Sequence, residues 1–169
     1  MYRLRLHLMF ACLITTTIGS VRGQEPKPPQ LTPEEQKLAA EAEKLDRELV
    51  QLYQRGQAAR AIVKAREALE IRRKLYPDGH PDLAFSLNDL GTVLQAMGSY
   101  ENAVPLFEQA LAMRHKLYPA SNYPDGHPEL ASSINNLGSL LQAMGLYEKA
   151  LPHVEQALAM FRKLYPASK

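Results

Sequence analysis

The chain copies itself, and this internal repeat constrains its fold more than any other feature. Residues 79–91 read GHPDLAFSLNDLG and return at residues 126–138 as GHPELASSINNLG, an offset of 47. The string KLYP begins at Lys74, Lys116 and Lys163. The first two copies are 42 residues apart and the last two are 47 apart, so the basic unit of 42 residues is followed by a longer one. A unit repeated at a period of roughly 20–50 residues is too small to bury its own apolar face. It must stack against its neighbours, which predicts an array of similar units.

Each unit has the pattern of two helices joined at a glycine. In the second unit, apolar side chains recur at helical spacing before Gly98, which is placed to end the helix in a left-handed conformation. These residues are Leu83, Leu87, Leu90, Leu94 and Met97, and the following helix has Ala103, Phe107, Ala110 and Leu111 on one face. No alternating pattern typical of a strand occurs. We therefore predict an all-α fold of about three helical hairpins.

Two glycines, Gly91 and Gly138, fall inside the first helix of their hairpins. A glycine within a helix costs about 1 kcal/mol relative to alanine, so each needs a packing reason. We expect the second helix to approach closely there and to present an alanine at the matching height.

The repeats, the turn signals and the proline content divide the chain into three parts. Residues 1–23 are predicted to be a signal peptide, 24–33 a proline-containing linker, and 34–169 the repeat domain, with repeats at about 34–75, 76–117 and 118–164. Thr32-Pro33-Glu34-Glu35 has the residues of a capping box and is predicted to start the first helix. The third unit is longer because residues 120–124 are inserted in its connector.

The repeated residues resemble the tetratricopeptide repeat. The small and large positions of that family match Gly91, Leu94, Ala103, Phe107 and Ala110, and again Gly138, Leu141, Ala150, Val154 and Ala157. The 42-residue period resembles the longer, kinesin-light-chain type of repeat. The resemblance implies a right-handed superhelical α-solenoid that acts as a non-catalytic scaffold for a protein or peptide partner.

The first unit departs from the pattern, and the chain as a whole departs from a true kinesin light chain. Leu49 occupies the glycine position of the first helix, and Ala65 replaces the large residue of the second. We interpret this unit as a divergent capping repeat. The predicted signal peptide and the missing coiled coil argue against a kinesin light chain.

In this family the first helix of each hairpin lines a concave face, and the binding residues lie at fixed places on it. The matching positions here are Asn88, Asp89, Thr92, Gln95, Asn135, Asn136, Ser139 and Gln142. An amide side chain both donates and accepts hydrogen bonds, which suits an extended peptide. The alternative is a solvated helix face on which the asparagines bond the neighbouring helix. The lysine–arginine set of carboxylate-clamp repeats is absent, which argues against recognition of a terminal carboxylate.

No motif for catalysis, a cofactor or a metal is present in the sequence. It has no glycine-rich phosphate loop, no nucleophile elbow, no paired cysteines and no histidine pair at metal spacing. His80 and His127 recur in DGHP connectors, where we interpret them as structural residues that bond the turn. Without residues 1–23 the chain has 17 basic and 18 acidic residues, so no basic surface for nucleic acid is expected.

The last unit predicts an open edge. Residues 164–168 copy the connector at residues 117–121, so the sequence stops where a further hairpin would begin. The side chains expected to be exposed at this edge are Val154, Leu158 and Phe161. This edge suggests a possible homo-oligomer through the C-terminal repeat. The alternative to a peptide-binding scaffold is therefore a self-associating module, or the truncated front part of a longer array without its own ligand.

The amino terminus has the three parts of a secretory signal. Arg3 and Arg5 precede an apolar run at residues 8–18, and Val21 and Gly23 stand at positions −3 and −1 of a cut before Gln24. The run is shorter than the ~20 residues that span a bilayer, so no stable membrane span is predicted. Lipid anchoring at Cys12 is the less favoured interpretation, because only half of a hydrophobic region precedes it. We expect the chain to be exported, to a periplasm or the medium.

This interpretation predicts the mass of the exported protein. Intact-mass analysis of protein recovered from the cell envelope or medium should give a chain that begins near Gln24, because the cut follows the small residue Gly23. A retained Met1, or a lipid on Cys12, would contradict it.

Overall fold

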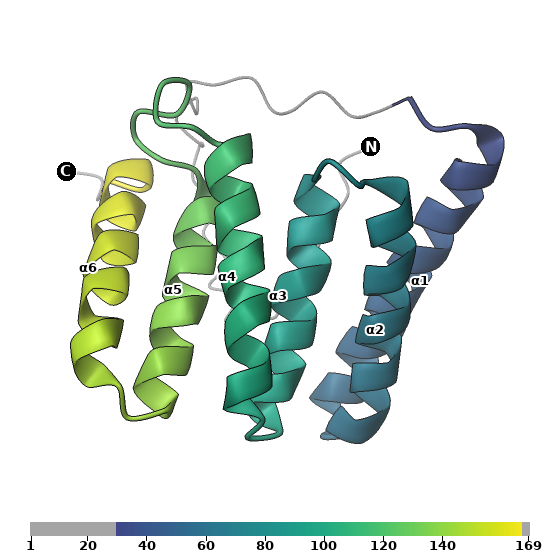
Figure 1. Cartoon of the computed structure of the whole chain (residues 1–169), viewed down its shortest axis with the longest axis horizontal. Helices are drawn as coiled ribbons and strands as arrows, with labels where there is room; N and C mark the ends of the chain where they lie inside the picture. The colour runs from purple at the N-terminus through teal and green to yellow at the C-terminus, as the bar shows by residue number, and fades with distance from the viewer. Residues whose placement is uncertain (1–29, 167–169) are drawn as a thin grey trace.

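The computed structural model describes residues 30–166, which form six α-helices. They are α1 (Pro33–Gln54), α2 (Ala58–Leu75), α3 (Pro81–Ala96), α4 (Tyr100–Leu117), α5 (Pro128–Ala143) and α6 (Tyr147–Leu164). Consecutive helices pair as the hairpins α1–α2, α3–α4 and α5–α6, which stand in a row in Figure 1. Residues 30–166 contain no strand. The predicted all-α fold of three hairpins is confirmed.

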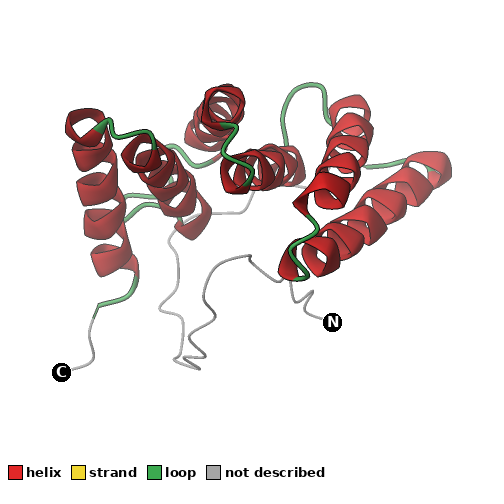
Figure 2. Ribbon diagram, turned by 90° about the horizontal axis from the view of Figure 1, so that it is seen from below, coloured by secondary structure: helices red, strands yellow, loops and turns green. Residues whose placement is uncertain are grey.

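The row of hairpins is curved rather than flat, as Figure 2 shows. Residues of α1, α3 and α5, the first helices of the three hairpins, together line one surface depression. The first helices therefore form the inner face of the curve.

Glycine turns each first helix into the second helix of its hairpin. Gly56, Gly98 and Gly145 have φ angles of 70°, 73° and 77°, a left-handed conformation that glycine adopts without a Cβ clash. At Gly98 the backbone N–H groups of Gly98 and Ser99 donate to the carbonyl oxygens of Gln95 and Leu94. These are the two hydrogen bonds of a Schellman motif, and they close the end of α3 as the sequence predicted.

The two glycines inside first helices do lie where the second helix approaches closely. A Cβ atom at Gly91 would be 2.9 Å from the Phe107 ring, and one at Gly138 would be 3.0 Å from Cγ2 of Val154. The expectation of an alanine opposite each glycine was wrong, because the large residue of the second helix fills that space. The first hairpin reverses the sizes: Leu49 and Ala65 stand at the equivalent positions, and both are fully buried.

Two apolar clusters form the core of the described residues. The first includes Leu49 of α1, Leu87 of α3, Phe107 of α4 and Leu140 of α5, and the second includes Ile134 of α5 and Ala157 of α6. The predicted stripe of α3 is buried from Leu83 to Leu94, but Met97 is 46% exposed because the helix ends there. None of the helices described is long and apolar enough to cross a membrane.

The first helix begins as the capping box predicted. The hydroxyl oxygen of Thr32 accepts from the backbone N–H of Glu35, and the Glu35 carboxylate accepts from the N–H of Thr32 at 2.8 Å. Two backbone donors that the helix would leave without partners are satisfied in this way.

The contact between Gly91 and Phe107 gives a prediction about stability. A Gly91→Leu variant should unfold at a lower denaturant concentration, with a loss of about 1–3 kcal/mol, because the added side chain overlaps the Phe107 ring. Replacing Phe107 with alanine in the same chain should make the added leucine much less costly. Ala112→Leu, at an exposed position of α4, is the control. Equal unfolding midpoints for wild type and Gly91→Leu would contradict the packing.

Candidate binding face

A buried arginine joins the first hairpin to the second. Arg72 in α2 is 3% exposed, and its guanidinium donates to both carboxylate oxygens of Asp46 in α1, with 2.9 Å between Nη1 and Oδ1. The same Nη1 donates to the hydroxyl of Ser86 in α3. One side chain therefore links three helices from two hairpins.

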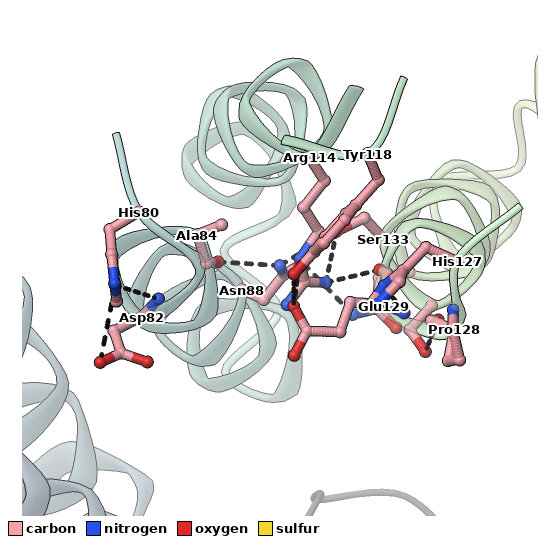
Figure 3. A network of polar contacts seen from close by, with 12 residues as sticks. His80, Asp82, Ala84, Asn88, Arg114, Tyr118, His127, Pro128, Glu129 and Ser133 are labelled. Carbon is pink, nitrogen blue, oxygen red and sulfur yellow. Dashed lines mark hydrogen bonds and ion pairs between the residues drawn. The ribbon is translucent and has the colours of Figure 1, made fainter. Parts of the chain in front are cut away.

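Arg114 in α4 makes the corresponding joint between the second and third hairpins (Figure 3). Its Nη1 donates to the Ser133 hydroxyl at 2.7 Å and to the backbone carbonyl of Glu129 at 2.8 Å, both in α5. The residue equivalent to Asp46 is Asn88, so this arginine lacks the bidentate carboxylate. Its ion pair is longer, 3.7 Å from Nε to the Glu129 carboxylate.

The two arginines differ in how well their charge is compensated. Burial opposes the charge of Arg72, but the hydrogen bonds and charge of Asp46 outweigh it and raise the Arg72 pKa. At Arg114 burial prevails over the more distant Glu129 carboxylate and lowers the Arg114 pKa. A guanidinium stays protonated in either case, so the second joint holds a positive charge with weaker compensation.

Asn88 serves the second joint rather than standing free on the helix surface. Its amide Nδ2 donates to the carbonyl of Ala84 at 2.9 Å and to the Ser133 hydroxyl at 3.2 Å, while its Oδ1 accepts from Asn136. Asn88 is 5% exposed. This is the arrangement described above as the alternative, an asparagine that bonds the neighbouring helix.

The recurring histidines start helices, as the sequence indicated. Nδ1 of His127 accepts from the backbone N–H of Glu129, and its ring stacks on Tyr118 with 3.6 Å between centroids. His80 repeats this arrangement at the start of α3 on Tyr76. The insertion adds Tyr123, which is buried edge-on against Tyr118 and His127. The sequence had identified this insertion only as a longer connector.

The inner face has a depression with a volume of about 380 Å³ between α1, α3 and α5. Six of the eight predicted binding residues line it: Asn88, Asp89, Thr92, Gln95, Asn136 and Ser139. Asn135 and Gln142 are not among its lining residues. Tyr53, which the first hairpin contributes, lines it as well, as do Phe85 and Arg114, which the sequence analysis had not assigned to the face.

The lining residues fall into two groups by exposure. Asn88 and Asp89 are buried, at 5% and 8% exposed, and form the floor with Arg114. Thr92, Gln95, Asn136 and Ser139 are half-buried, so these four can reach a ligand. Thr92 also donates its hydroxyl to the backbone carbonyl of Asn88.

The depression is lined by polar groups and aromatic rings. Its half-buried groups are amides and hydroxyls, accompanied by the rings of Tyr53 and Phe85. Within residues 30–166, no group of three histidine, cysteine, aspartate or glutamate side chains could hold a metal ion. The face therefore offers hydrogen bonds and apolar contact to a ligand.

The comparisons with known proteins agree with this architecture. The family model for the tetratricopeptide repeat matches residues 50–116 and 120–163. No curated protein matches the chain significantly.

Solved structures share the fold. A Podosopora anserina protein described as a kinesin light chain with nearly identical TPR-like repeats is 25% identical, with a TM-score of 0.65 over 82% of this chain and 61% of that one. BtubC (BKLC) from P. vanneervenii is 24% identical, with a TM-score of 0.64 over 76% of this chain. The TPR domain of Arabidopsis FLU is 19% identical, with a TM-score of 0.59 over 77% of this chain and 98% of that domain. The chain spans half the length of BtubC.

The arginine joints give a second prediction about stability. Arg72→Met should cost about 3 kcal/mol of unfolding free energy, because it leaves the carboxylate of Asp46 without its partner. A double variant Arg72→Met/Asp46→Leu should recover much of that loss. Arg73→Met is the matched control, since Arg73 forms an exposed pair with Glu70 that contributes roughly 0–1 kcal/mol. Equal effects at positions 72 and 73 would refute the joint.

Proposed function

We propose that this chain, which belongs to the tetratricopeptide repeat family, is a non-catalytic scaffold that holds an extended peptide along its inner face. The observation that carries the proposal is the depression between α1, α3 and α5. Six residues at family binding positions line it, and four of them are half-buried. The peptide can be a free one or a segment of a partner protein.

An extended peptide suits the lining of the depression. Its backbone leaves N–H and C=O groups without partners, and these need groups that both donate and accept. Gln95 and Asn136 have amides of that kind, one on each of the two neighbouring first helices. Tyr53 and Phe85 add ring surface for an apolar side chain of the ligand.

Export places the partner outside the cytoplasm. The proposal for export rests on the basic start, the apolar run and the small residues of positions 1–23, which lie outside the described residues. A repeat domain without cysteine after Cys12 needs no disulfide in an oxidising compartment.

The proposal predicts the effect of removing two reachable amides. Peptides that bind the full chain are first selected from a display library of unbiased 12-residue peptides and then measured by fluorescence anisotropy. In a Gln95→Ala/Asn136→Ala variant the dissociation constant of such a peptide should rise about tenfold, since each hydrogen bond contributes about 0.5–1.5 kcal/mol.

The control is Gln109→Ala, at an exposed position of α4 that does not line the depression. It should leave both the dissociation constant and the unfolding midpoint unchanged. The double variant should have a lower unfolding midpoint, because Asn88 loses the hydrogen bond from Asn136, and it should remain fully helical at the assay temperature. The proposal fails if no library peptide binds, or if the double variant binds the selected peptides as tightly as the wild type.

A further inference from the structure

The outer face of α6 exposes an apolar stripe. Its residues are Tyr147, Leu151, Leu158 and Tyr165, which are 66%, 57%, 47% and 57% exposed. Intervals of four and seven residues place the first three on one side of α6, and Tyr165 follows directly at the C-cap of the helix. Leu158 is exposed, as predicted from the sequence. Val154 and Phe161, predicted to be exposed as well, are half-buried, and Val154 packs toward Gly138.

The equivalent positions of α4 are covered by the next hairpin. They are Tyr100, Val104, Leu111 and Tyr118, which pack into the two apolar clusters that contain Leu137, Leu140 and Leu130 of α5. The α6 stripe thus has the chemistry of a surface that in the second hairpin is an interface. In residues 30–166 no helix covers it.

The α6 edge lacks the arginine that would join a further hairpin. The residue that corresponds to Arg72 and Arg114 is Phe161, whose ring stacks on Tyr165. The surface of α6 therefore has the apolar residues of an interface between repeats but not the arginine that bonds to the next hairpin. This argues against a further repeat of the same kind as the partner of α6.

The opposite end of the array is not complementary to the α6 stripe. Leu83, Ser86 and Leu90 of α3 are buried, and Ser86 accepts a hydrogen bond from Arg72 of the preceding hairpin. The equivalent positions of α1 are occupied by Glu41, Lys44 and Glu48. The half-buried Glu48 forms ion pairs with the exposed Lys44 and with Lys64 of α2. Covering these charges with an apolar face would cost their hydration, so copies of the chain are unsuited to stacking head to tail. The α1 end is therefore charged at positions where α3 is largely apolar.

Charges along one edge of the stripe fit a second copy of α6. Glu148, Glu155 and Arg162 are all exposed and follow one another at intervals of seven residues. If two α6 helices pack antiparallel, Glu148 of each copy lies beside Arg162 of the other. Glu155 then lies near its own counterpart at the twofold axis. Antiparallel packing also opposes the two helix dipoles.

We propose that the α6 stripe is a homodimer surface, on which α6 of one copy packs antiparallel against α6 of a second copy. A contact of this kind is isologous and closes after two copies. It involves one helix of 18 residues, about 27 Å long, so it falls in the class of interfaces that bury less than about 1,200 Å². The dimer should accordingly be weak and reversible, with a dissociation constant on the order of 10–100 µM.

Sedimentation equilibrium of the exported protein, expected to begin near Gln24, tests the surface. The apparent mass should rise from monomer to dimer with concentration and should not exceed the dimer. Leu151→Glu/Leu158→Glu should raise the dissociation constant more than tenfold. Val63→Glu is the matched control, because Val63 is 49% exposed on α2 and lies outside the stripe. It should dimerise as the wild type does.

Charge reversal tests the antiparallel orientation. Glu148→Arg and Arg162→Glu should each raise the dissociation constant roughly threefold, since each sets like charges beside one another across the interface. The double variant Glu148→Arg/Arg162→Glu should return it to within about twofold of wild type. Glu155→Gln should tighten the dimer by removing the repulsion at the axis.

Four results would overturn the proposal: a monomer at about 500 µM, species larger than a dimer, a dimer unaffected by the two leucine replacements, or no recovery in the double charge reversal. The outcome is independent of peptide binding. Gln95→Ala/Asn136→Ala lies on the inner face and should leave the dimer unchanged.

Discussion

A buried guanidinium between successive hairpins is the contact on which the arrangement of this array depends. Apolar packing alone would allow neighbouring hairpins to slide, because leucine side chains interact without direction. Arg72 reaches Asp46 in its own hairpin and Ser86 in the next, which fixes the distance and the orientation of the pair. Arg114 repeats the bond to Ser133. The direction of these hydrogen bonds sets how the first helices stand side by side, and that sets the inner face.

The second joint forms part of the inner face, because Arg114 and Asn88 both line the depression. Asn88 replaces the aspartate of the first joint, and its amide turns to α5, where it meets Ser133 and Asn136. In the floor of the depression the Asn88 amide is therefore already hydrogen-bonded within the protein, while Gln95 and Asn136 are more exposed. The bond from Asn136 to Asn88 holds one of these two amides in place before a ligand binds. In the third hairpin Phe161 takes the place of the arginine, and the surface beyond it is apolar and exposed.

The architecture could be predicted from the sequence because the same apolar spacing and turn residues recur in successive units. Helix positions, the glycine turns, the capping box of α1 and the structural role of His127 all follow from local rules, and the structure has them. The periodicity could not predict which residues of a neighbouring hairpin each side chain contacts. It placed Asn88 on the polar face, but whether that face meets water or another helix depends on the curvature of the array. It also could not show that Phe107, rather than an alanine, fills the space left by Gly91.

Side-chain amide signals in an ¹⁵N–¹H NMR spectrum test the central claim most directly, namely that the first helices form a face on which the half-buried amides of Gln95 and Asn136 contact a ligand and the buried amide of Asn88 does not. The full chain would be titrated with a peptide selected from the unbiased library. The account predicts that the Gln95 and Asn136 side-chain signals shift on binding while the Gln109 signals do not move. It also predicts that the Asn88 amide stays protected from solvent exchange, before and after the peptide is added. Shifts confined to Gln109 and other outer positions, or rapid exchange of the Asn88 amide, would contradict it.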